Sequence, residues 1–145
     1  MELKEAQEKL TPKKYREALN FIELRDIYLK QTNCLLHSRT VAESANIEIK
    51  DKISDVKIVE NVAIIEHQYS IKVASGGTDN FELSATFVLK YELKKTLPEE
   101  FYEIYKSVSL PVHSYPFFRE LVSSMVTRAG LPKLIMPLRK DVYSN

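Results

Sequence analysis

The sequence has few of the residues that carry most enzyme chemistry and most covalent cross-links. A single cysteine, Cys34, excludes an internal disulfide and suits a reducing compartment. The three histidines, His37, His67 and His113, lack metal-ligand spacing, so we expect no bound metal and no cofactor. Glycine is scarce, with 3 residues, and neither a phosphate-binding loop nor a Gly-x-Ser-x-Gly motif is present. We therefore expect no catalytic residues; an enzymatic interpretation would need one of the histidines to meet an acid in a cleft.

A net charge of one sign is also missing. Lysine and arginine total 21 against 20 acidic residues, which leaves a formal charge of +1 and no general attraction for nucleic acid or an acidic membrane. No apolar run approaches the ~18 residues that a membrane span needs, and the first residues are charged throughout. The expectation is a cytoplasmic protein that is neither exported nor inserted, folded as one domain over residues 1–145.

Two segments alternate between apolar and polar residues at the period of a β-strand. In the first, Ile65, His67, Tyr69, Ile71 and Val73 share one face. In the second, the apolar face consists of Phe81, Leu83, Ala85, Phe87, Leu89, Tyr91 and Leu93. Gly76-Gly77 between them predicts a turn, and the pair predicts an antiparallel sheet with one packed face. His67 lies on that face and is best interpreted as a hydrogen-bonded core histidine.

Weaker alternation predicts a first strand between Phe21 and Leu36, and one long strand or two over residues 47–64. Residues 1–20 are typical of an N-terminal helical extension, and residues 96–108 of another helix. The clearest helix follows, with Ser114 as N-cap, Pro116 in the first turn and Gly130 at the stop. This order predicts an α+β fold, a four-stranded antiparallel sheet with helices packed on one face.

The last helix and the segment after it resemble the C-terminal half of the SecB family of protein-export chaperones. The residues that carry the resemblance are Pro116, Phe117, Arg119, Glu120, Met125, Val126, Arg128, Pro132, Leu134 and Pro137. A second stretch, Arg25-Asp-Ile-Tyr-Leu-Lys30, is similar to the opening of the family's first strand. The resemblance implies a SecB-like fold and a dimer of dimers. It also implies an ATP-independent holdase that binds unfolded or nascent polypeptide and, in many members, passes it to a translocase ATPase.

The sequence departs from the family at the acidic positions that dock the translocase. The aligned residues here are Gln31, Leu35 and Lys90, so we expect the docking surface to be missing. The chain also ends at Asn145, eight residues after Pro137, where the family carries a further helix and an acidic tail. These departures favour a divergent chaperone dedicated to one client, such as an antitoxin, over a role in preprotein export.

Substrate-binding candidates are apolar residues expected to line grooves near the first strand and the last helix. Tyr102, Phe117 and Tyr143 lie off the apolar stripes of their segments, so we expect them to be exposed. The full set is Leu29, Leu35, Leu36, Tyr102, Tyr115, Phe117, Leu138 and Tyr143. The alternative is a small-molecule binding domain for an apolar ligand, which would need a sealed pocket between the sheet and the 116–129 helix.

Overall fold

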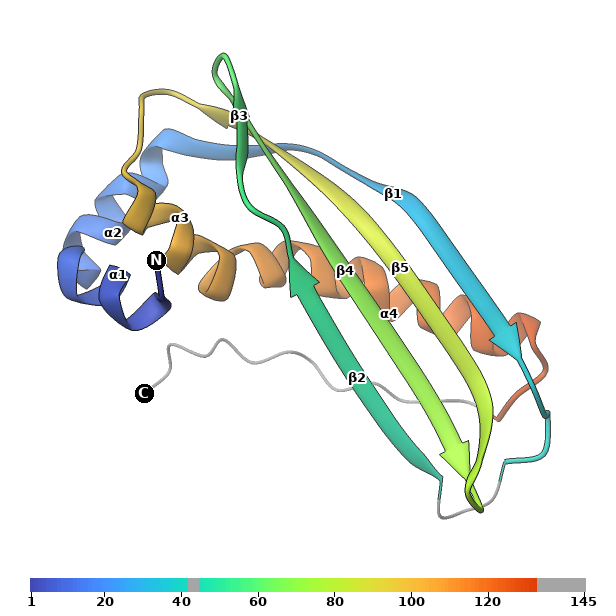
Figure 1. Cartoon of the computed structure of the whole chain (residues 1–145). Helices are drawn as coiled ribbons and strands as arrows, with labels where there is room; N and C mark the ends of the chain where they lie inside the picture. The colour runs from blue at the N-terminus through green and yellow to red at the C-terminus, as the bar shows by residue number, and fades with distance from the viewer. Residues whose placement is uncertain (42–44, 133–145) are drawn as a thin grey trace.

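The computed structural model describes residues 1–41 and 45–132, in which five antiparallel strands form a sheet with a long helix along one face (Figure 1). The elements in chain order are α1 (Leu3–Lys9), α2 (Pro12–Ala18), the 3-10 turn η1 (Leu19–Phe21), β1 (Ile22–Leu36), β2 (Asn46–Ile53), β3 (Lys57–Val59), β4 (Val62–Ser75), β5 (Thr78–Leu93), α3 (Glu99–Val108) and α4 (Leu110–Arg128). The α+β class predicted from the sequence is confirmed.

The sheet has the order β1-β5-β4-β2, and β3 pairs with β4 beyond the end of β2. Because β2 and β3 occupy the same edge of β4 in succession, the fifth strand does not widen the sheet beyond the four predicted strands. Ser54 bridges the gap between them: its backbone N–H donates to the Glu66 carbonyl, and its hydroxyl accepts from the Glu66 N–H, both at 2.9 Å. The range 47–64, predicted as one long strand or two, is therefore divided among β2, β3 and the first residues of β4, because the chain turns between Val59 and Val62.

Strands β4 and β5 form the centre of the sheet, and their alternation places the core on one face as predicted. Opposite residues such as Ile71 and Leu83 share the face toward α4 and are both buried. Tyr69 stacks on Phe118 of α4, with ring centroids 4.7 Å apart. Gly76 and Gly77 both have positive φ, which suits the tight turn between β4 and β5. Sheet and helix are thus held together by aromatic packing.

Helix α4 begins earlier than the sequence pattern predicts. Its first turn contains Pro111, and the helix continues through Pro116, so Ser114 is an interior residue rather than the N-cap. Ser114 is fully buried, because its side chain points to the sheet instead of capping a helix end. The predicted stop is confirmed: Gly130 has φ +70°, and the Leu131 N–H donates to the Val126 carbonyl at 3.1 Å.

The N-terminal residues are helical, as predicted, and pack at one end of the molecule against α3 (Figure 1). Thr11 caps α2, where its hydroxyl accepts from the Lys14 N–H at 3.3 Å. The Tyr15 ring lies 5.2 Å from the Phe101 ring, and its hydroxyl is 2.6 Å from the Ser109 hydroxyl. The extension is therefore fixed to the α3–α4 junction by both apolar and polar contacts.

Candidate functional site

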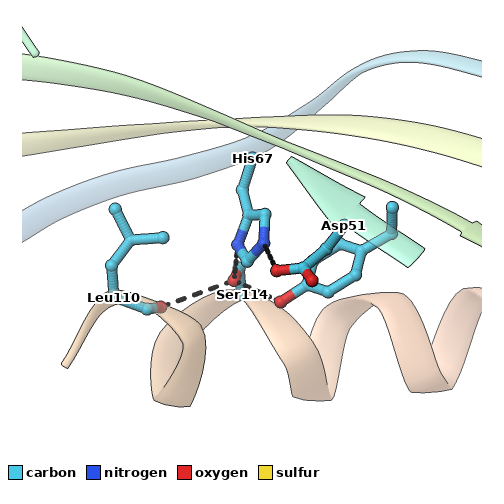
Figure 2. A network of polar contacts seen from close by, with 5 residues as sticks. Asp51, His67, Leu110 and Ser114 are labelled. Carbon is cyan, nitrogen blue, oxygen red and sulfur yellow. Dashed lines mark hydrogen bonds and ion pairs between the residues drawn. The ribbon is translucent and has the colours of Figure 1, made fainter. Parts of the chain in front are cut away.

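A buried polar network joins the edge strand β2 to helix α4 through β4 (Figure 2). His67 is fully buried, with Nδ1 2.7 Å from the Ser114 hydroxyl and Nε2 2.7 Å from a carboxylate oxygen of Asp51. The Tyr69 hydroxyl lies 2.8 Å from the same serine oxygen. The prediction of a hydrogen-bonded core histidine is confirmed, whereas the roles of Asp51 and Ser114 were not predicted.

One assignment of hydrogens satisfies this whole network. The Asp51 carboxylate can only accept, so Nε2 of His67 donates to it, and in the neutral imidazole Nδ1 is then an acceptor. The Ser114 hydroxyl then donates to Nδ1 and accepts from the Tyr69 hydroxyl. A second acceptor, the Leu110 carbonyl, lies 3.4 Å from the serine oxygen. The network therefore links three elements, with the hydrogen bonds to Ser114 fully buried and the Asp51 carboxylate partly exposed at the edge of the sheet.

Serine, histidine and aspartate in hydrogen-bonded sequence are also the residues of an acyl-transfer triad. That chemistry needs a serine oxygen that a substrate carbonyl can approach and donors for the developing oxyanion. Here the Ser114 oxygen is fully buried and already contacts His67 and Tyr69. Asp51 does contact His67, but the serine that would have to act as nucleophile is inside the core, so the geometry suits a structural role.

A second histidine, His113, is packed between Tyr91 and Tyr105 at the start of α4. The Tyr91 hydroxyl lies 3.0 Å from Nδ1 of His113, and burial raises the pKa of this hydroxyl. Tyr91 also interacts with the Tyr105 hydroxyl, so a neutral His113 can take part in this hydrogen bond either as acceptor or as donor. Burial lowers the pKa of His113, in agreement with that hydrogen bond.

The His113 environment predicts an acid-sensitive contribution to stability. Its pKa is lowered in the folded state, so the unfolded chain takes up the proton first, near pH ~6.5. The contribution is complete above that pH and is lost as the pH falls through the folded pKa. We expect His113→Gln to have a smaller loss of unfolding free energy than the parent between pH ~7.5 and ~5 in urea titrations. Equal slopes for the parent and His113→Gln would contradict the prediction.

Exposed apolar side chains lie along β1 and α4, on the face of the sheet that carries the helix. Leu29 is opposite the buried Phe87, and Leu36 is opposite the buried Phe81, so both face the helix side. Phe117 of α4 also contacts Phe87, with the two rings 6.4 Å apart and edge to face. Leu29, Leu36 and Phe117 are 41%, 42% and 46% exposed. We call these three residues the β1–α4 strip; all three are predicted binding residues, and they lie on the same face of the sheet.

The other predicted binding residues do not join this strip. Leu35 is exposed but lies on the opposite face of the sheet, since its partner is Glu82. Tyr115 is buried and packs against Tyr69 in the core. Leu138 and Tyr143 lie outside the described residues.

The predicted exposure of Tyr102 is wrong, because its side chain is only 5% exposed. Its position off the apolar stripe of α3 was interpreted as a solvent-facing position. The β3–β4 turn and the segment after β5 lie on that side, and Ile58 and Leu97 line a pocket together with Tyr102. Tertiary contacts from distant segments therefore bury a residue that α3 alone would expose.

The face of the sheet away from α4 carries charges of both signs. Arg25 pairs with Glu92 across β1 and β5, and Lys30 pairs with Glu66 of β4. Gln31, Leu35 and Lys90 lie on this face, as their partners Thr86, Glu82 and Asp26 indicate. The positions aligned with the family's translocase-docking acids are thus set among paired charges of both signs.

The interior between the sheet and α4 is filled with aromatic side chains. Tyr69 contacts Phe87, Tyr115 and Phe118, and all four rings are at most 6% exposed. The alternative of a ligand pocket in this position finds no support in that packing. Among residues 1–41 and 45–132, no group of three or more histidine, cysteine or acidic side chains is placed to hold a metal ion.

The architecture is that of the SecB-like chaperones, which confirms the resemblance at the level of the fold. The chain is similar to a SecB-like chaperone of Mycobacterium tuberculosis solved in complex with a ChAD peptide from the HigA1 antitoxin. That match has a TM-score of 0.75 and 18% identity and covers 87% of this chain and 96% of the other. A protein of unknown function from Streptococcus agalactiae matches with a TM-score of 0.46 and 12% identity over 81% of this chain and 97% of that one.

No protein-family model matches the sequence, and no curated protein matches it either. Within the part of the chain that the structure describes, no helix is long and apolar enough to cross a membrane. The likeness is therefore one of fold, carried by the arrangement of the strands and α4.

Proposed function

We propose that this protein is a SecB-like holdase chaperone that binds an extended segment of an unfolded or nascent polypeptide. The binding surface is the β1–α4 strip of Leu29, Leu36 and Phe117. Three large apolar side chains left in water on one face favour an interface or a binding surface. This observation carries the proposal.

The position of β1 at the edge of the sheet supports the same proposal. β1 runs from Ile22 to Leu36, and its second edge has no neighbouring strand within the described part of the chain. The free backbone groups of an edge strand can pair with an extended peptide, while the strip receives its apolar side chains. Binding of this kind needs no nucleotide, so the holdase acts without ATP.

A dedicated client, of the kind represented by an antitoxin, fits this chain better than general export. The structural neighbour was solved with an antitoxin peptide, whereas Gln31, Leu35 and Lys90 here replace the family's docking acids. We further propose that the chain works as a dimer of dimers in the cytoplasm. Sedimentation equilibrium of the full chain should give the mass of a tetramer.

The direct test is suppression of aggregation by the purified full chain. A chemically unfolded client protein is diluted into buffer without ATP, with and without stoichiometric chaperone, and light scattering is followed. We expect scattering to fall with increasing chaperone and to be unchanged by added ATP. If no unfolded client is held at equal concentration, including a peptide from a neighbouring antitoxin, the proposed function is wrong.

A further inference from the structure

A small pocket lies at the end of the molecule where β3, β5 and α3 meet. Its volume is about 230 Å³, below the ~300–1,000 Å³ of clefts that hold drug-sized ligands. Ile58, Leu93 and Leu97 supply apolar walls, and the exposed side chains of Lys94, Lys95 and Thr96 stand at its mouth. Glu60 and Asn61 of the β3–β4 turn complete the lining.

The fourth wall is Tyr102, whose hydroxyl has no hydrogen-bond partner within the described residues although it is buried. A buried hydroxyl without a partner is costly, and most buried polar groups in native proteins avoid this state. Burial also raises the pKa of this hydroxyl, so it keeps its proton and can act as a donor. Removing the hydroxyl would remove that cost, whereas an acceptor that enters the pocket would form the missing hydrogen bond with the hydroxyl.

The charges beside the pocket indicate which acceptor fits. The Lys95 ammonium lies 3.9 Å from the centre of the Phe21 ring, and Lys94 makes no ion pair within the described ranges. Glu60 adds one negative charge, so the lining is net positive. We propose that the pocket binds a small carboxylic acid with a compact branched aliphatic body. One carboxylate oxygen accepts from Tyr102, the carboxylate pairs with Lys94, and the aliphatic body contacts Ile58, Leu93 and Leu97.

We expect a ligand to enter at the mouth of the pocket, beside Lys94 and Thr96. The side chains of Lys94 and Thr96 are exposed, and exposed side chains change rotamer within nanoseconds. The site is independent of the β1–α4 strip, so a failed holdase test would leave this proposal standing, and the reverse also holds.

The test compares isovalerate with isoamyl alcohol, which has the same branched skeleton without the carboxylate. Binding to the full chain is followed by amide chemical-shift titration. We expect isovalerate to shift amides of residues 58–61 and 93–102, and the alcohol to shift them at least ~10-fold more weakly. Inorganic phosphate, an anion without an apolar body, should not bind at the same concentrations.

Two pairs of variants locate the site. Tyr102→Phe should weaken isovalerate binding ~10-fold or more while its unfolding midpoint stays equal to or above that of the parent. Lys94→Gln should also weaken binding, whereas Tyr28→Phe and Lys57→Gln, exposed controls outside the pocket lining, should not. The proposal is overturned by absent binding, by equal binding of the alcohol or phosphate, or by unchanged affinity in Tyr102→Phe. A crystal structure of the acid-soaked protein with only water on the hydroxyl would overturn it as well.

Discussion

Replacing Phe117 by aspartate is expected to weaken binding of an unfolded client by at least ~100-fold while leaving the fold intact. A client that docks on the β1–α4 strip would bury the new carboxylate beside Phe87 with no cation to pair with it, and burial of an unpaired charge is strongly unfavourable. The folded monomer tolerates the change because the side chain is half-exposed. The dissociation constant of a labelled client, measured by fluorescence anisotropy, checks the result.

Val112→Asp provides the matched control on the same helix. Val112 is 52% exposed, slightly more than Phe117, but lies near Leu19 and Leu24 rather than on the strip. The same substitution there should change client affinity less than ~3-fold, because a surface charge away from an interface has little effect on binding. Equal losses in the two variants would mean that charge on α4, and not the strip, controls binding.

A second pair of variants tests which face of β1 contacts the client. Leu29 and Leu35 are similarly exposed residues of one strand, but Leu29 faces the helix side and Leu35 the opposite side. We expect Leu29→Asp to reduce affinity by ~10-fold or more and Leu35→Asp to have little effect. The reverse order would move the binding surface to the other face of the sheet.

Local sequence patterns were sufficient to predict those parts of the fold that depend on residues close together in the chain. The alternation in β4 and β5 fixes which residues face α4, because successive strand residues point to opposite faces. The glycine stop of α4 is likewise set by residues 126–131 alone. The β1–α4 strip was only partly predictable, since the sequence did not reveal that Leu35 faces away from Leu29 across a register shift between Leu29 and Gln31.

Long-range contacts explain what the sequence pattern missed. Ser114 was interpreted as a helix cap because it stands two residues before Pro116, whereas its partners His67 and Tyr69 are 47 and 45 positions away. Asp51 could have been noticed as an acid in the alternating row of Ile47, Ile49 and Ile53, which share its face. No local sequence pattern connects Asp51 with a serine on α4, so this network could be recognised only from the three-dimensional structure.

Replacing Ser114 by alanine should lower the free energy of unfolding by about 2–3 kcal/mol. The change removes the hydroxyl shared by His67 and Tyr69, and a buried hydrogen bond contributes ~1–1.5 kcal/mol net. Alanine is the best helix former, so the helix itself does not lose from the substitution. Urea unfolding followed by circular dichroism measures the difference.

Ser123→Ala is the control for this prediction, because Ser123 is an exposed residue of the same helix. Its hydroxyl makes no hydrogen bond within the described part of the chain, so the substitution should be neutral or stabilise by up to ~0.5 kcal/mol through helix propensity. Equal stability of Ser114→Ala and Ser123→Ala would show that the buried network adds nothing to the fold. A loss confined to Ser114→Ala would show that the hydrogen bonds of Ser114 to His67 and Tyr69 stabilise the fold, and Figure 2 shows His67 in contact with both Asp51 and Ser114.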